Sequence, residues 1–317
     1  MKYVHTRAER RNARRVVRVA VAVLAITGTA LVAAPVAGAA TNAPGTAVRS
    51  DGVVVKAENA AASTSVSRSF GGRTGGESAT VDGPSVDTAP RFFGSESVIG
   101  SDGRVQVNPT TSNLQSKATA LITFTQNGSS YICTGWMIGA NTLATAGHCV
   151  SPAKNQWNSV SSYRIYPAKN GSTNPYGSCT AKWLATDTNW FSNRDANYDY
   201  AAIKLNCTVG NSTGWFGFFW QSATLTGLPA TIQGYPADKT YGTQWTMSGT
   251  IASSNATTVS YSIDTYGGQS GSAIWYNRSG CGVCSMGIHA YGSSGGNSGT
   301  RITSRVFNNL VSWKNAS

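Results

Sequence analysis

Ser270, a serine flanked by glycines, is the first residue of this 317-residue sequence that could do chemistry. It lies in the segment 264–272, DTYGGQSGS, where the glycines let the backbone turn sharply. Such a turn leaves two N–H groups able to point at a developing oxyanion, so the segment predicts a nucleophile loop. Because the chain holds 35 glycines, such a pattern also arises by composition alone, and Ser298 in 295–299, GGNSG, is a rival.

A serine nucleophile needs a base, and His148 is the better placed of the two histidines in the second part of the chain. It follows the apolar segment 142–146 and is next to Cys149. Since a base must be held rigidly, a disulfide beside it favours this role. The other histidine, His289, is a candidate for a different role.

The base in turn needs a carboxylate that fixes its tautomer and stabilises the imidazolium. Asp199 stands at the start of an alternating apolar segment, 201–205, where the two flanking tyrosines would half bury it. Asp187 and Asp195 lie in polar stretches, where we expect them to be solvated. Asp199 is therefore the predicted partner of His148.

The order of these residues along the chain narrows the choice of fold. An α/β-hydrolase would need its acid and its histidine after the serine, and no Asp or Glu follows Ser270. The subtilisin order would need an Asp before His148, and Asp102 is a poor candidate for it. Ser298 is set aside because polar loop surrounds it and only nineteen residues follow it. The order His148, Asp199, Ser270 remains, and it is that of the chymotrypsin type.

Short apolar bursts separated by Gly, Asn, Ser and Pro predict the elements that position these residues, which are β-strands joined by tight turns. The bursts occur between residues 121 and 203 and return in 216–232, 245–251 and 259–274. Only the tail has apolar residues at helical spacing, which predicts a C-terminal helix over about 302–314. The predicted fold is all-β, in two halves, with a closing helix.

Composition and charge limit the partners of the chain. It is 40% hydrophobic and only 12% charged, which indicates a globular protein. The formal charge is +12, but residues 97–317 contribute +7 (thirteen Lys/Arg against six Asp) and hold no basic run interleaved with aromatic residues. We therefore expect no nucleic-acid partner, a mild bias toward acidic substrates, and a monomer.

The first 96 residues differ in character from the rest. Seven Lys/Arg among the first eighteen residues, an apolar run and a small-residue cleavage site predict a signal peptide over 1–39. A membrane anchor is the alternative, but Thr, Gly and Pro interrupt the run, and the export route stays open between the general and the twin-arginine route. The stretch 40–96, without Cys or Trp, predicts a propeptide. The mature domain, 97–317, is then secreted and extracellular, with no stable membrane association after signal cleavage.

All six cysteines lie beyond residue 96 and predict three disulfides in an exported chain. Closing the first loop should contribute about 3 kcal/mol to stability. A redox or zinc pair in the single CxxC motif is the alternative, which the lack of a second such pair disfavours. Proximity favours Cys133 with Cys149 and Cys281 with Cys284, which leaves Cys179 with Cys207.

Three motifs carry a family resemblance: TAGHC around His148, DYAAI from Asp199, and GGQSGS around Ser270. They resemble the chymotrypsin-like serine endopeptidases, and specifically the bacterial glutamyl endopeptidases, and the likeness extends over essentially the whole mature domain. The resemblance implies two six-stranded antiparallel β-barrels with these residues in the cleft between them. It also implies an oxyanion hole formed by the N–H groups of Gly268 and Ser270. Gln269 replaces the acid found before the serine in trypsin, so the ion pair that trypsin makes there is not expected.

The resemblance further implies a substrate site in which His289 and the hydroxyl of Thr265 hold an acidic side chain. Asp264 favours the opposite specificity, because trypsin keeps an acid at this position that selects Lys and Arg. The distribution of glutamate favours Glu, since all four glutamates lie at or before Glu96 and the remaining 221 residues contain none. Self-cleavage after Glu96 would release Ser97 and spare the mature domain.

The expected function is a secreted serine endopeptidase that cuts after Glu, and after Asp more slowly, through an acyl-enzyme intermediate. We expect protein and peptide substrates, no cofactor and no metal in the site. Two alternatives stay open. One is trypsin-like specificity through Asp264, and the other is an inactive binding relative that kept the fold.

Overall fold

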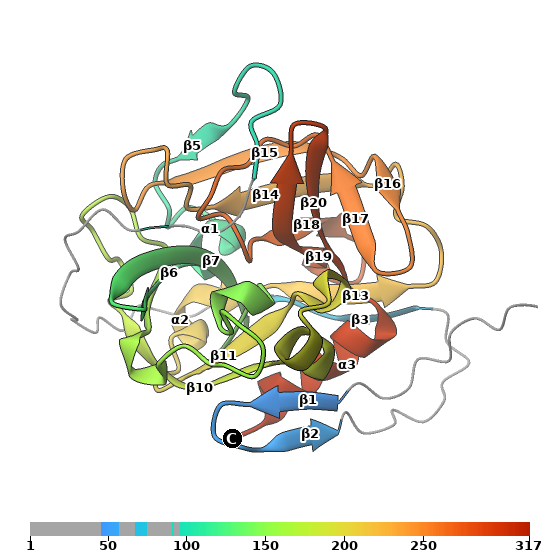
Figure 1. Cartoon of the computed structure of the whole chain (residues 1–317). Helices are drawn as coiled ribbons and strands as arrows, with labels where there is room; N and C mark the ends of the chain where they lie inside the picture. The colour runs from blue at the N-terminus through green and yellow to red at the C-terminus, as the bar shows by residue number, and fades with distance from the viewer. Residues whose placement is uncertain (1–45, 57–66, 75–90, 92–95) are drawn as a thin grey trace, which may run out of the picture. The chain divides into compact units, whose positions relative to one another are not determined.

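The computed structural model describes residues 46–56, 67–74, 91 and 96–317, which form two strand-rich halves and a C-terminal helix (Figure 1). The predicted signal peptide, 1–39, lies outside the described residues. No helix among the described residues is long and apolar enough to cross a lipid bilayer. The predicted all-β class is confirmed.

The first half is a closed six-stranded antiparallel barrel. Its strands follow the order β11, β8, β7, β6, β9, β10, and β10 also pairs with β11, which closes the ring. Large apolar side chains such as Trp136, Leu143 and Ile203 fill its core and are fully buried. The strands are β6 (Thr119–Gln126), β7 (Ser129–Gly139), β8 (Thr142–Thr145), β9 (Arg164–Pro167), β10 (Cys179–Asp187) and β11 (Ala201–Leu205).

The second half also has six main antiparallel strands, as predicted, in the order β17, β20, β19, β18, β14, β15. Among the described residues β15 and β17 do not pair with each other, so this half is closed less completely than the first. The strands are β14 (Pro229–Gly234), β15 (Gln244–Thr250), β17 (Thr258–Tyr261), β18 (Ala273–Arg278), β19 (Gly282–Ser293) and β20 (Gly296–Arg301). Shorter strands, β5 (Val105–Val107), β13 (Gly217–Gln221) and β16 (Ser253–Ser254), extend the sheet.

The C-terminal helix is α3 (Ser304–Asn315), close to the predicted range. It begins at Thr303, whose hydroxyl accepts the N–H of Val306 and so caps the first turn. Its apolar stripe, which includes Phe307 and Trp313, is buried against the core of the first barrel. Two shorter helices, α1 (Leu114–Ala118) and α2 (Gly210–Thr213), lack a periodic apolar stripe and were not predicted.

The described parts of the predicted propeptide add strands to the sheets formed by residues 97–317. β1 pairs with β10, β3 pairs with β13, and β4 pairs with the short strand β12. Ala47 is fully buried, and the guanidinium of Arg49 lies 4.1 Å from the ring centre of Trp183. The four strands are β1 (Thr46–Arg49), β2 (Val54–Lys56), β3 (Ser67–Phe70) and β4 (Arg73–Thr74), and β12 is Gly214–Trp215.

The sequence-based expectation that Asp187 is solvated is wrong. Asp187 is fully buried at the end of β10 and accepts two hydrogen bonds from Arg305 of α3, both at 2.8 Å. The hydroxyl of Tyr200 donates to it as well, at 2.7 Å. A bidentate Arg–carboxylate pair is a strong, oriented contact, so Asp187 ties α3 to the first barrel.

The three disulfides have the pairing that proximity favoured: Cys133 with Cys149, Cys179 with Cys207, and Cys281 with Cys284. The first joins β7 to the turn that carries His148. Its two cysteines are separated by 16 positions in the sequence, whereas those of the third are separated by only 3.

Replacing Cys133 and Cys149 together by Ser should lower the free energy of unfolding by about 3 kcal/mol, because the unfolded chain gains the entropy of the opened loop. The matched control opens the short loop by replacing Cys281 and Cys284, and should cost about 1.6 kcal/mol in the same treatment. Urea unfolding of the mature protein, followed by tryptophan fluorescence, measures both losses. Equal losses would show that loop entropy is not the origin of the stabilisation.

Candidate active site

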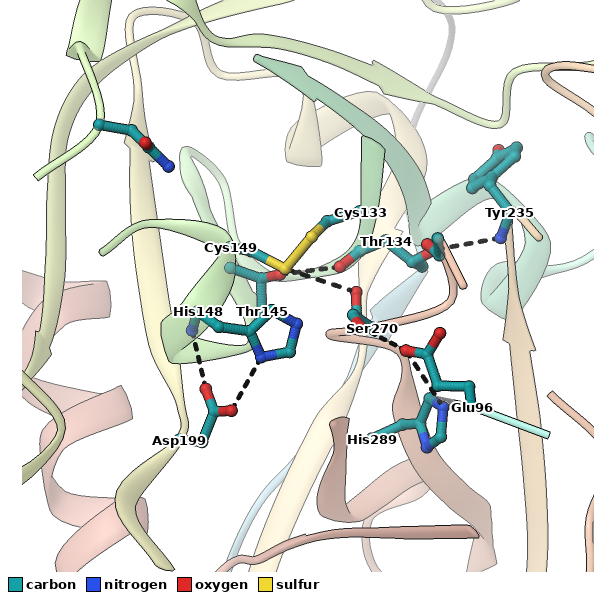
Figure 2. The surroundings of a disulfide bond; sticks show 12 residues. Glu96, Cys133, Thr134, Thr145, His148, Cys149, Asp199, Tyr235, Ser270 and His289 are labelled. Carbon is teal, nitrogen blue, oxygen red and sulfur yellow. Dashed lines mark hydrogen bonds and ion pairs between the residues drawn. A yellow bond between two sulfur atoms is a disulfide. The ribbon is translucent and has the colours of Figure 1, made fainter. Parts of the chain in front are cut away.

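His148 and Asp199 are brought together by two neighbouring strands. His148 lies in the turn η1 (Gly147–Cys149) after β8, and Asp199 follows the turn η4 (Ala196–Tyr198) before β11, which pairs with β8. Asp199 Oδ2 lies 2.8 Å from His148 Nδ1, and Oδ1 accepts the backbone N–H of His148 at 2.8 Å. Figure 2 shows the imidazole between Asp199 and Ser270. The carboxylate therefore contacts both the ring and the backbone of His148.

The second partner of Asp199 is Tyr291 of β19, whose hydroxyl donates to Oδ2. Asp199 is fully buried, and burial raises its pKa. The charge of His148 and the hydrogen bonds from His148 and Tyr291 outweigh burial, so the pKa of Asp199 lies below its ordinary value. Tyr291 lies 92 residues away in sequence and was not predicted, whereas the flanking Tyr200 donates to Asp187 instead.

The serine loop is held against the first barrel by Thr134 of β7. The backbone N–H of Thr134 donates to the carbonyl of Ser270 at 2.9 Å, and its hydroxyl donates to the carbonyl of Gly268 at 2.9 Å. The carbonyl of Thr134 accepts the hydroxyl of Thr145 at 2.8 Å. These bonds connect the nucleophile loop to β7 and β8, and β8 leads directly to His148.

The glycines on either side of Ser270 are needed for this close approach. Gly268 has φ +101° and Gly271 has φ +91°, a region that favours glycine. A Cβ on Gly271 would lie 2.2 Å from the carbonyl oxygen of Thr134, and one on Gly268 would lie 2.6 Å from that of Tyr235. The loop therefore has the conformation that the glycine pattern predicted.

Glu96, the last residue of the predicted propeptide, is buried beside Ser270 (Figure 2). The hydroxyl of Ser270 donates to Glu96 Oε1, and the same oxygen lies 3.7 Å from His289 Nε2. Burial raises the pKa of Glu96 well above its ordinary value, although hydrogen bonds from the side chain and backbone of Ser270 oppose the shift. The backbone N–H of Ser270, a predicted oxyanion donor, is thus directed toward this carboxylate.

His289 forms the other side of the space that Glu96 fills. It is fully buried in β19, and the hydroxyl of Tyr261 lies 2.6 Å from its Nδ1. Burial, together with the charge of His148, lowers the pKa of His289 to about 3, so the imidazole is neutral at neutral pH. Tyr261 belongs to β17, next to β20 in the sheet, and was not singled out from the sequence.

The two remaining candidates, Thr265 and Asp264, differ in the hydrogen bonds that their side chains make. Thr265 Oγ1 and Glu96 Oε2 are both buried, and neither has a hydrogen-bond partner among the described residues. Asp264 instead accepts backbone N–H groups from Ile99 at 2.7 Å and Gly103 at 2.8 Å. Thr265 is therefore available to a ligand, whereas both oxygens of Asp264 are engaged by the chain itself.

Gln269, at the position where trypsin has an acid, contacts the side chain of Arg104. Its Oε1 accepts the backbone N–H of Tyr266 at 3.0 Å and lies 3.5 Å from Arg104 Nη1. Arg104 is buried and also forms ion pairs with Asp102 and Asp238. An internal arginine thus supports the residue before Ser270.

Comparison with known proteins agrees with this arrangement. A trypsin-like peptidase domain family matches residues 133–283. Over 228 residues the chain is 43% identical to a glutamyl endopeptidase of Bacillus licheniformis, covering 70% of each chain. Over 221 residues it is 40% identical to a Bacillus subtilis protein named extracellular metalloprotease, covering 69% of this chain and 70% of that one.

Two solved structures are similar as well. A Glu endopeptidase in complex with MPD has a TM-score of 0.60 at 31% identity, covering 69% of this chain and 100% of that one. The protease Anisep from Arthrobacter nicotinovorans has a TM-score of 0.55 at 25% identity, covering 66% of this chain and 99% of that one.

Two antiparallel β units and the match to the trypsin-like peptidase domain family identify the chain as a trypsin-like serine endopeptidase. The sequence comparison is more specific than the fold. The chain belongs to the family of the glutamyl endopeptidases. The resemblance drawn from the three motifs is thereby confirmed.

One group of possible metal donors occurs among the described residues, Cys133, His148 and Cys149. The two cysteines are joined in a disulfide, so neither offers a thiolate. Cys281 and Cys284 are joined as well, so in this state they offer no thiolate to a metal.

The contribution of buried Glu96 to the stability of the folded protein should fall as pH rises. A carboxyl group with a raised pKa contributes stability that is complete below its ordinary pKa of 4.5 and is lost as pH rises through the raised value. Glu96→Gln keeps the shape and removes the titration. Both proteins carry His148→Ala, so that the chain stays uncut, and they differ only in having Glu or Gln at position 96. We expect their melting temperatures to be similar at about pH 4, and the protein with Gln to be increasingly more stable above about pH 5.

Thermal unfolding monitored by circular dichroism over this pH range measures the difference. The His148→Ala background prevents cleavage and keeps the Ser270 hydroxyl that contacts Glu96. A difference that stays constant with pH would contradict a protonated, buried Glu96.

Proposed function

We propose that Ser270 attacks the carbonyl carbon of the scissile peptide bond while His148 takes its proton and later delivers it to the leaving amine. Asp199 orients His148 through its two contacts and stabilises the imidazolium. The N–H groups of Gly268 and Ser270 stabilise the oxyanion. Water then releases the acyl group by the same proton transfers.

We further propose that the bond cut follows a glutamate, or more slowly an aspartate. The observation that carries this proposal is the position of the chain's own Glu96, whose carboxylate lies between Ser270 and His289. A glutamate side chain is therefore long enough to bring a carboxylate to His289 beside the nucleophile. Aspartate is one methylene shorter and reaches less far.

Hydrogen bonding explains how a neutral histidine recognises an acid. In the tautomer with the proton on Nε2, His289 accepts the hydroxyl of Tyr261 at Nδ1 and directs Nε2–H toward the carboxylate. Thr265 Oγ1, buried without a partner among the described residues, supplies a second donor. An unpaired donor is costly in a buried site, so a substrate lacking the carboxylate is disfavoured.

The same proposal covers maturation and location. The signal peptide, 1–39, directs export, the propeptide 40–96 is removed by a cut after Glu96, and residues 97–317 act outside the cell on protein and peptide substrates. Two observations support it: Glu96 already occupies the site, and no glutamate follows it in the chain. The name of the B. subtilis relative also includes the word extracellular.

His289→Ala should lower kcat/KM for peptides cut after Glu by about 100-fold, because a hydrogen bond to a charged or partly charged carboxyl is lost. Tyr261→Phe should have a smaller effect, about fivefold, since it only orients His289. Kinetics on matched peptides with Glu, Asp, Lys or Arg before the scissile bond measure both. The rate of labelling by a fluorophosphonate reports whether Ser270 remains reactive.

Unchanged cleavage after Glu in His289→Ala would overturn the assigned substrate site. Preference for Lys or Arg in the unaltered enzyme would favour the trypsin-like alternative, and failure of the unaltered enzyme to label would favour the inactive one. N-terminal sequencing adds an independent test, because Ser270→Ala protein should retain the Glu96–Ser97 bond that the active protein cuts.

A further inference from the structure

Asp264 is a buried acid whose two oxygens are both used by one short segment, 97–103. Asp264 is only 1% exposed. Oδ1 accepts the N–H of Ile99 at 2.7 Å, and Oδ2 accepts the N–H of Gly103 at 2.8 Å. Among the described residues it takes part in no ion pair with Lys or Arg. The position that selects basic substrates in trypsin thus has a different task here.

We infer that Asp264 is a positioning residue for glutamate recognition, which anchors the start of the mature chain as part of the wall of the substrate site. The inference rests on the proposed function and extends it to a residue that itself binds no substrate. It also explains why an acid at this position does not make the site select Lys or Arg.

Asn297 of β20 is the second anchor of the same segment. Its Oδ1 accepts the N–H of Ser97 at 3.0 Å, and its Nδ2 donates to the carbonyl of Ser97 at 2.7 Å. Nδ2 also donates to the carbonyl of Ile263 at 2.8 Å, which ties the segment to the residue before Asp264. Asn297 is 1% exposed, so these bonds are shielded from water.

The anchors act on the substrate site through Thr265. The carbonyl of Ser97 accepts the backbone N–H of Thr265 at 3.2 Å. Ser97 therefore faces Thr265, while Ile99 binds the side chain of Asp264 next to it. If the segment is released, Thr265 loses this bond, and the hydroxyl proposed to meet the substrate loses its support.

A carboxylate suits this task better than an amide. Two N–H groups point at the side chain from two places in the segment, and only a carboxylate presents an acceptor to each. In Asp264→Asn one N–H group would face the NH₂ of the amide. A buried charge is tolerated because hydrogen bonds satisfy both of its oxygens.

The test uses the mature enzyme, prepared where necessary with a trace of unaltered enzyme. We expect Asp264→Asn to raise KM for Glu peptides about 10-fold and Asp264→Ala about 50-fold, with kcat changed less than about threefold. Labelling of Ser270 by a fluorophosphonate, which needs no acidic side chain, should proceed at the unaltered rate. This split separates loss of recognition from damage to the reacting groups.

A second readout needs no catalysis by the enzyme itself. An added aminopeptidase should remove residues from Ser97 onward faster in Asp264→Ala than in the unaltered protein, as followed by mass spectrometry. Asn297→Ala should have the same effect. Because both side chains hold one segment, the double variant should raise KM by less than the product of the two single effects.

Several outcomes would overturn the inference. A lower KM in Asp264→Asn would mean that the acid acts only as a charge that repels the substrate. Equal trimming in all variants would mean that Asp264 does not anchor the segment. If the unaltered enzyme shows no preference for Glu, the proposed function fails by itself, while the trimming rates still decide whether the anchor exists.

Discussion

Thr134 is the residue through which the two halves of the protein meet at the site. In the proposed reaction a nucleophile carried by the second half has to lie within reach of a base carried by the first, so the contacts that join the halves set their relative position. Thr134 is fully buried and binds the backbone of the serine loop on one side and β8 on the other. The glycine at 271 permits this close approach, because a Cβ there would lie 2.2 Å from the carbonyl oxygen of Thr134.

The site keeps two acidic groups in opposite states by surrounding them differently. Both Asp199 and Glu96 are buried, which alone would raise the pKa of each. Asp199 receives hydrogen bonds from His148 and Tyr291 that favour its anion, whereas burial prevails at Glu96 and favours its protonated form. One carboxyl is thereby held as an anion next to His148, while the other is favoured in its protonated form beside Ser270.

The sequence allowed prediction of the parts of the site that local pattern encodes. Residue type, chain order and flanking glycines identified His148, Asp199 and Ser270 as candidates, and short apolar bursts indicated two β halves. The supporting contacts could not be predicted, because Tyr291 and Asn297 meet their partners across 92 and 200 residues of sequence. Asp187 was misjudged for the same reason, since its arginine partner lies 118 residues further along. Long-range pairing of polar groups leaves no periodic signal in the sequence.

The strands that precede Glu96 have a consequence for the proposed cut of the bond between Glu96 and Ser97. β1, β3 and β4 pair with β10, β13 and β12, so the upstream piece is attached along the sheet edges as well as through the peptide bond. While the chain is intact, the two pieces are present at the high effective concentration of an intramolecular contact. The proposed cut would remove that advantage and turn the attachment into a bimolecular equilibrium. Dilution would then favour separation without any further chemical step.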